Sequence, residues 1–129
     1  MKVQGYDIGA CGVEQLFYAG EIAFDTDGAS TGVETLELPA GVIVTRATAV
    51  VNKAFNAGTT NVLTVGTNDD ADDILGSSDI TEGTAGVYTV NKFVELSAAT
   101  KVKIKYTQTG TAATAGSAEI YLHLVRIPV

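Results

Sequence analysis

The C-terminal part of the chain alternates between apolar and polar residues with a period of two, and this pattern limits the fold more than any other feature. Within 101–107, three apolar residues alternate with three lysines: Val102, Ile104 and Tyr106 against Lys101, Lys103 and Lys105. Within 117–127, alternate positions hold Ala118, Ile120, Leu122 and Leu124, with Tyr121, His123 and Val125 between them. Because successive side chains of a β-strand point to opposite faces, both segments are predicted to be strands with one buried face.

Further segments are rich in β-branched or aromatic residues and are also predicted to be strands: 13–24, 35–38, 42–53, 61–66 and 88–96. Gly20 is predicted to form a β-bulge, and the last of these strands to be interrupted near Asn91. One face of the first strand is expected to carry Leu16, Tyr18, Ile22 and Phe24. One face of 42–53 is expected to carry Ile43, Thr45, Ala47, Ala49 and Val51. Residues 68–76 are compatible with one helical turn.

About seven or eight short strands without a long helical period predict an all-β fold, an antiparallel β-sandwich. A jelly roll is the preferred topology, although the pattern alone fits an immunoglobulin-like sandwich as well. Residues 1–12 contain Gly5, Gly9 and Gly12 and show little periodicity. They are predicted to form an extended N-terminal arm, and 13–129 a single domain.

The charge and the cysteine content limit the partners and the compartment. A formal net charge of −7 argues against binding to nucleic acid and against docking on anionic membranes. Cys11 is the only cysteine, so an internal disulfide is excluded and synthesis in a reducing cytoplasm is expected. An inert thiol is favoured over a nucleophile. The first residues lack the apolar segment of a signal peptide, and no apolar run is long enough to span a membrane.

The acidic cluster is the most concentrated polar feature. Asp69, Asp70, Asp72 and Asp73 place four carboxylates within five residues, and carboxylate oxygens are ligands for Ca²⁺. The spacing of an EF-hand is absent, because the glycine and the glutamate that this loop needs are missing. A solvated loop is therefore favoured, and no metal or other cofactor is predicted.

No set of residues has the spacing of a catalytic site. His123 has no Cys, His or acidic neighbour in the sequence, so a packed or surface histidine is favoured over a base or a ligand. Ser77-Ser78-Asp79 lacks the frame of a nucleophile elbow, and 110–116 lacks the ending of a phosphate-binding loop. The chain is therefore predicted not to be an enzyme.

Two places are candidates for contact with a partner protein. Lys101, Lys103 and Lys105 form either a binding stripe for an acidic partner or a strand face protected against aggregation, and the sequence leaves both readings open. Tyr6 and Asp7 lie in the arm, and irregular surface segments such as the arm and the acidic loop are where interactions concentrate.

Two segments carry a resemblance to a known family. Residues 52–67 contain AFNAGTT followed by LTVGT, and 104–116 lead through a Thr/Gly/Ala-rich turn into the last strand. Over 33–127 the chain resembles small jelly-roll virion proteins of tailed bacteriophages, notably capsid cement or decoration proteins. The resemblance implies a non-enzymatic homotrimer that is made in the host cytoplasm and binds the major capsid protein on the outer surface of the head.

A different binding role is the alternative. A tail-fibre domain or another receptor- or carbohydrate-binding module shares the sandwich architecture, because a fold does not fix a function. Such a module needs an exposed aromatic patch, for which the candidates are Tyr6, Tyr18, Tyr88 and Tyr121.

Overall fold

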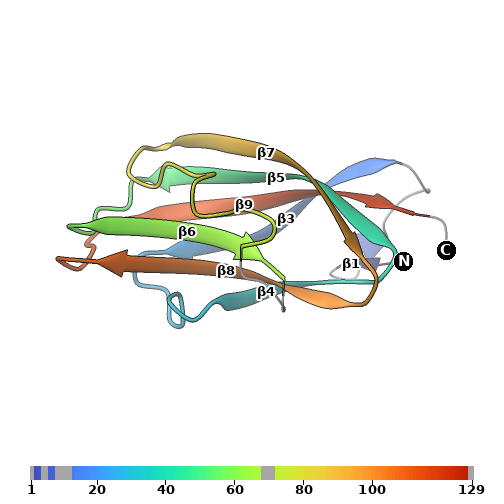
Figure 1. The fold of residues 1–129 in the computed structure, drawn as a ribbon, viewed down its shortest axis with the longest axis horizontal. Coiled ribbons are helices and arrows are strands. Elements are labelled where there is room, and N and C mark those ends of the chain that lie inside the picture. Colours follow the sequence, from blue (N-terminus) through green and yellow to red (C-terminus); the bar gives the residue numbers. More distant parts are fainter. Residues whose placement is uncertain (1, 4–5, 8–12, 68–71, 128–129) are drawn as a thin grey trace.

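Seven long strands pack as two antiparallel sheets in the computed structural model, which describes residues 2–3, 6–7, 13–67 and 72–127 (Figure 1). One sheet has the order β3-β9-β5-β7, and the other has the order β4-β8-β6. The bounds of the long strands are β3 Glu14–Ala23, β4 Val33–Leu38, β5 Val42–Lys53, β6 Thr60–Gly66, β7 Gly86–Leu96, β8 Thr100–Thr109 and β9 Ser117–Arg126. Two short strands, β1 (Lys2–Val3) and β2 (Tyr6–Asp7), pair with each other. The predicted all-β sandwich is confirmed.

The strand pairs are nested around one point in the sequence. β3 pairs with β9, β4 with β8, and β5 with β7, each in antiparallel register. Representative partners are Ala23 with Ser117, Leu38 with Thr100, Val51 with Gly86, and Val65 with Leu75. Each pair is enclosed by the one before it, and successive pairs fall alternately in the two sheets. The chain is thus one long hairpin rolled into a sandwich, which is the jelly-roll arrangement.

A jelly roll usually has eight strands. Here the position of the eighth strand, beside β6, is taken by a single β-bridge between Val65 and Leu75. The backbone N–H of Val65 donates to Leu75 O at 3.0 Å, and the N–H of Leu75 donates back to Val65 O at 2.8 Å. The sequence is compatible with one helical turn in 68–76. In the described residues 72–76 this prediction is wrong, since they contain a hydrogen-bonded turn, bends and this bridge. The reason is packing: Ile74 and Leu75 are fully buried in the core. Within the described ranges, no helix is long and apolar enough to cross a membrane.

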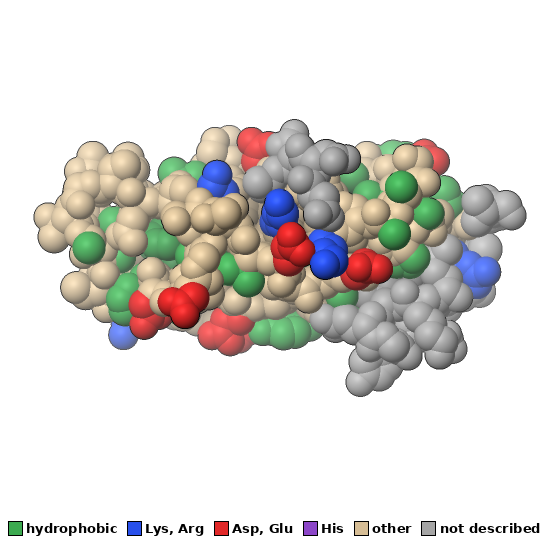
Figure 2. Space-filling model, turned by 90° about the horizontal axis from the view of Figure 1, so that it is seen from below, with side chains coloured by type: hydrophobic (Ala, Val, Ile, Leu, Met, Phe, Trp, Pro, Cys, Tyr) green, Lys and Arg blue, Asp and Glu red, His purple; other side chains and the backbone are tan. Residues whose placement is uncertain are grey.

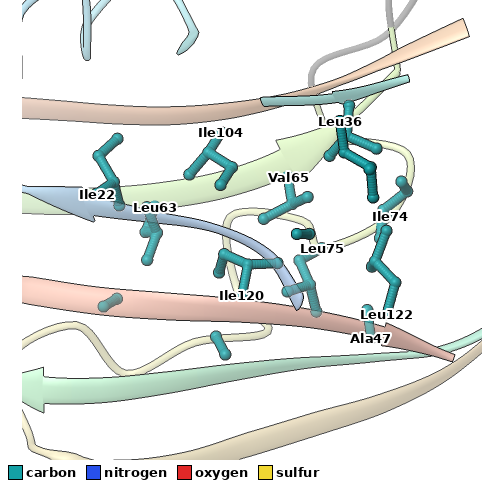
Figure 3. Close-up of a cluster of buried hydrophobic side chains, with 14 of the residues drawn as sticks. Ile22, Leu36, Ala47, Leu63, Val65, Ile74, Leu75, Ile104, Ile120 and Leu122 are labelled. Carbon is teal, nitrogen blue, oxygen red and sulfur yellow. The ribbon is translucent and has the colours of Figure 1, made fainter. Parts of the chain in front are cut away.

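The core lies between the sheets and receives alternate side chains from both (Figure 3). The alternation predicted for β8 and β9 is confirmed, because the following residues are all buried: Val102, Ile104, Tyr106, Ala118, Ile120, Leu122 and Leu124. The rings of Phe55 and Tyr106 close one region of the core, with centroids 4.5 Å apart.

The predicted bulge at Gly20 is confirmed, and it changes which residues of β3 are buried. The register against β9 shifts between Tyr18 and Gly20, so the alternation changes phase there. Ile22 is buried, whereas Leu16 and Tyr18 are 58% and 45% exposed. The prediction that these three side chains share a face is therefore wrong.

β5 contains a second bulge that the sequence does not reveal. Against β9, Val44 pairs with Leu124 and Arg46 with His123, so Thr45 is an extra residue. The prediction that Ile43 shares a face with Ala47 is wrong: Val42, Val44 and Ala47 belong to the core cluster, whereas Ile43, although buried, lies outside it. On the other side of β5, the register against β7 also shifts, between Val44 opposite Val94 and Arg46 opposite Asn91. The interruption of the strand predicted near Asn91 is wrong, because β7 runs unbroken from Gly86 to Leu96 and only its pairing with β5 shifts there.

Candidate interaction surface

On the outer face of the three-stranded sheet, two of the three lysines of β8 lie opposite glutamates of β4, and Lys105 lies opposite Thr64 of β6. The lysines of β8 alternate with the buried Val102, Ile104 and Tyr106 and so point away from the core. Lys101 Nζ lies 3.3 Å from Glu34 Oε2, and the register places Glu37 opposite Lys101 and Glu34 opposite Lys103. Figure 2, which views the side on which β4 and β8 lie in Figure 1, shows acidic and basic side chains next to one another. This matching favours the protective reading of the lysine row.

The outer face of the four-stranded sheet carries exposed apolar side chains. Among the described residues, the exposed large hydrophobic side chains on strands are Leu16, Tyr18, Val87 and Phe93. All four lie on β3 and β7, the two edge strands of this sheet, with Val87 and Phe93 exposed to 67% and 73%. The four side chains share one face of the sheet, as two pairs separated by β9 and β5.

The register arranges this face in rows that cross all four strands. The first row contains Leu16, His123, Arg46 and Asn91. The second row contains Tyr18, Tyr121, Thr48 and Thr89. The third row contains Glu21, Glu119, Val50 and Val87. Residues far apart in the sequence are thus neighbours on one surface.

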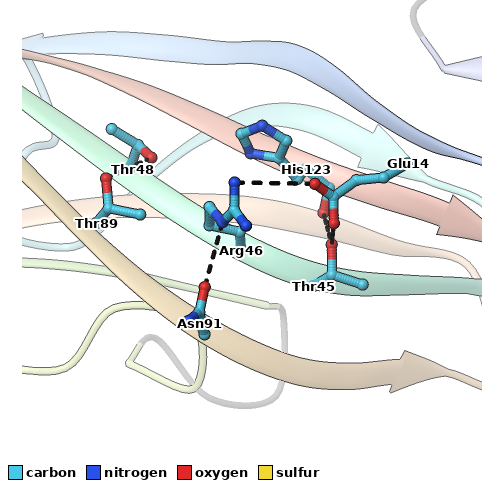
Figure 4. A network of polar contacts seen from close by, with 7 residues as sticks. All are labelled: Glu14, Thr45, Arg46, Thr48, Thr89, Asn91 and His123. Carbon is cyan, nitrogen blue, oxygen red and sulfur yellow. Dashed lines mark hydrogen bonds and ion pairs between the residues drawn. The ribbon is translucent and has the colours of Figure 1, made fainter.

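A polar network fixes the first of these rows (Figure 4). Arg46 Nε donates to Asn91 Oδ1 at 3.2 Å, and Arg46 Nη1 lies 3.9 Å from Glu14 Oε1. The hydroxyl of Thr45 donates to Glu14 Oε2 at 2.7 Å. Glu14 comes from β3, Thr45 and Arg46 from β5, and Asn91 from β7, so the network spans the sheet. It places the guanidinium of Arg46 between Asn91 and the opposite charge of Glu14.

The second and third rows bring two tyrosines and two glutamates together. The rings of Tyr18 and Tyr121 have centroids 5.4 Å apart at an interplanar angle of 58°. The hydroxyl of Tyr121 donates to Glu119 Oε2 at 2.6 Å, and this bond is the main cause that raises the pKa of Tyr121. The pKa of Tyr18 is raised by burial first, and then by the negative charges of Glu21 and Glu119. Of the four tyrosines named for an aromatic patch, Tyr18 and Tyr121 thus lie together, and Tyr18 is the more exposed of the two.

The other tyrosines named in the sequence do not join this pair. The hydroxyl of Tyr88 donates to the carbonyl of Thr84 at 2.6 Å, and its ring packs against the core. Tyr6 and Asp7 form β2, whose backbone pairs with β1; their side chains lie outside the described part of the structure, as does Cys11.

The acidic cluster and His123 form no site in the described structure. Asp73 Oδ1 accepts from the backbone N–H of Thr67 at 2.9 Å, and Asp73 Oδ2 accepts from its hydroxyl at 2.8 Å. This supports the loop interpretation of the cluster, whose Asp69 and Asp70 lie outside the described residues. His123 stands between Leu16 and Arg46 on the outer face. The described residues contain no group of three or more His, Cys, Asp or Glu side chains that could hold a metal ion.

The comparisons with known proteins identify the fold. No family model and no curated protein matches the sequence. A chain of the cyanophage Pam1 capsid asymmetric unit is similar over 95% of this chain and 90% of its own, with 23% identity and a TM-score of 0.67. A chain of the Ralstonia phage GP4 capsid is similar over the same shares, with 15% identity and a TM-score of 0.63.

A third chain comes from the acidic stable capsid structure of Helicobacter pylori bacteriophage KHP30, with 15% identity and a TM-score of 0.58. The similarity covers 93% of this chain and 97% of that one. All three coverages are high in both directions, so each matched chain is about as long as this one. The fold implied by the resemblance to phage virion proteins is thus shared with short chains of three phage capsid structures.

Proposed function

We propose that the chain is a structural protein of a phage particle, a cement or decoration protein that binds the outer surface of the capsid and stabilises it. The observation that carries the proposal is the fold, which matches short chains of three phage capsid structures over nearly their whole length. A sandwich of this kind can attach through one of its outer faces to a shell formed by another protein.

The outer face of the four-stranded sheet is the surface that we assign to this attachment. Protein interfaces are enriched in aromatic residues, and a few well-placed residues carry most of the binding energy. Leu16, Tyr18, Val87 and Phe93 supply exposed apolar area on this face. The network around Arg46 keeps the face ordered before binding, which lowers the entropic cost of association.

The partner in this proposal is the major capsid protein, and the assembly is a homotrimer. Three linked copies bind a symmetric shell with much higher avidity than one copy, even if each single contact is weak. The role requires no catalysis, no nucleic acid and no membrane. The chain is then made in the host cytoplasm and resides on the capsid surface. The arm with Tyr6 and Asp7 remains a sequence-based candidate for a further contact.

Co-sedimentation with phage heads tests the proposal. The purified chain is mixed with heads that were assembled without it, and the pellet is analysed for bound chain. We expect saturable binding and heads that withstand a higher temperature before they release DNA. A chain that stays monomeric in sedimentation equilibrium and never pellets with heads overturns the proposal.

The second candidate function is a tail-fibre or other carbohydrate-binding module. The Tyr18–Tyr121 pair favours it, because aromatic faces on an exposed sheet are platforms for sugar rings. A glycan array distinguishes the two functions. Binding to a defined glycan that is lost in Tyr18→Ala supports the second candidate, whereas an array without signal removes it.

A further inference from the structure

Two glutamates lie directly opposite each other on the outer face of the four-stranded sheet. Glu21 of β3 pairs in register with Glu119 of β9, and the same row continues with Val50 and Val87. Like charges in directly opposed positions destabilise an antiparallel pair. Among the described residues, the ion pairs join cations to Glu14, Glu34 and Asp79, and to neither of these two carboxylates. The register thus places two negative charges opposite each other, an arrangement that an opposite charge would relieve.

Two tyrosines lie next to these carboxylates on the same face of the sheet. Tyr121 donates its hydroxyl hydrogen to Oε2 of Glu119, and Tyr18 packs against Tyr121. The other oxygen of Glu119 and both oxygens of Glu21 accept no hydrogen bond from a described residue. The aromatic rings and the open carboxylate oxygens thus face the same side of the sheet. We call Tyr18, Glu21, Glu119 and Tyr121 the Tyr–Glu patch.

An arginine side chain has the chemistry that this patch lacks. Its planar guanidinium forms paired hydrogen bonds with carboxylates and stacks on aromatic rings, which a compact ammonium group does less well. The exposed Val87 in the same row, and Leu16 beside Tyr18, add apolar area around the charge. A tyrosine cluster with a desolvated arginine is a common composition for the centre of an interface.

We propose that the Tyr–Glu patch docks an arginine-bearing, otherwise apolar surface of the capsid protein. The inference rests on the proposed function and names the chemistry of the partner at that contact. Charge complementarity selects this occupant: the patch is acidic, and a guanidinium between Glu21 and Glu119 would offset the charges of both carboxylates.

A second copy of the chain is a poorer occupant. The same patch of a second copy brings two more carboxylates, and the guanidinium of Arg46 is already engaged by Glu14 and Asn91. Lys101 and Lys103 of a second copy lie opposite Glu37 and Glu34 of their own chain, and the row holds ammonium groups only. The other arginine of the chain, Arg126, has a buried Nε, so neither of these two surfaces offers an accessible guanidinium within an apolar surrounding.

The double variant Glu21→Gln/Glu119→Gln tests the inference on phage heads that lack the chain. Its affinity for heads is expected to fall about tenfold, and to depend less on salt, because a charge-assisted contact is lost. Its melting temperature is expected to stay equal or to rise, because the repulsion is removed. The matched control is Glu34→Gln/Glu37→Gln on the other sheet, which is expected to bind like the wild type.

The outcomes separate this inference from the proposed function. Wild-type binding that the double variant retains in full overturns the inference and leaves the proposed function standing. Wild-type protein that fails to bind heads overturns the proposed function, and the inference with it. If the double variant binds heads normally but loses a self-association that the wild type shows in sedimentation, the occupant is a second copy and the inference is wrong.

Discussion

The carboxylate of Glu82 accepts a hydrogen bond from the backbone N–H of Leu63 at 2.8 Å, at the edge of β6 where an eighth strand would pair. Both residues are buried. The carbonyl of Glu82 also accepts from the backbone N–H of Phe55 at 2.9 Å. One residue therefore satisfies an edge donor of the three-stranded sheet and ties the long 67–85 connection to the preceding loop.

Removing this acceptor is expected to destabilise the fold. Glu82→Ala leaves the buried N–H of Leu63 without a partner, which costs about 1–3 kcal/mol. Glu82→Gln keeps a carbonyl acceptor and is expected to cost less. Urea unfolding followed by circular dichroism measures both, with the exposed Glu37→Ala as the control. A midpoint for Glu82→Ala that equals that of Glu37→Ala would show that the bond does not support the edge.

Gly116 is expected to tolerate no larger residue. Its φ is +143°, and a Cβ atom there would overlap the ring of Phe55, which is itself buried against Tyr106. Gly116→Ala should therefore cost about 2 kcal/mol or more through overpacking and backbone strain. Gly83→Ala is the control, because nothing lies near its added methyl group. Equal thermal stability of the two variants would contradict the predicted overlap.

The sequence predicts the fold well where one period persists along a strand. β8 and β9 keep their alternation throughout, so their buried faces follow from the pattern alone. β3 and β5 each contain an extra residue that reverses the alternation. Glycine marks the first of these bulges, but Thr45 gives no such signal, because it is a common strand residue. The faces of Leu16 and Ile43 therefore cannot be read from periodicity.

The candidate surface depends on pairing between distant segments, which the sequence does not contain in readable form. Glu21 and Glu119 become neighbours only because β3 pairs with β9. The lysine row is visible in the sequence, but its matching with Glu34 and Glu37 follows from the β4–β8 register. The sequence does contain one signal for this surface. The outer face of β9 carries three large side chains, those of Tyr121, His123 and Val125, which indicates a face that contacts other groups.

Alkaline pH is expected to weaken the protein through its tyrosines. The pKa of Tyr121 is raised above its ordinary value of 10.0 by the hydrogen bond to Glu119, and burial raises the pKa of Tyr106. A raised pKa in the folded state means that the folded protein holds these protons more tightly than the unfolded chain does. The contribution of these tyrosines to the free energy of unfolding is therefore fully present below pH 10. It is lost as the pH rises through their pKa values in the folded protein.

Urea unfolding at about pH 8 and about pH 11 measures this loss. Tyr121→Phe removes one of the contributing groups, so its stability is expected to fall less steeply between these two pH values than that of the wild type. Thr48→Ala, in the same row, removes a hydroxyl that does not titrate in this range and serves as the control. Identical pH dependence of Tyr121→Phe and the wild type would show that the hydrogen bond to Glu119 does not hold the proton.

The two outer faces are expected to differ in their effect on head binding. Phe93 is 73% exposed, so Phe93→Ser should change the free energy of unfolding by no more than about 0.5 kcal/mol, as exposed substitutions usually do. It should nevertheless weaken binding to phage heads, because it removes apolar area from the surface assigned to the contact. Lys103→Gln/Lys105→Gln changes the opposite face and is expected to leave binding intact. Loss of binding in the lysine variant, with normal binding of Phe93→Ser, would move the contact to the three-stranded sheet and restore the lysine row as the binding stripe.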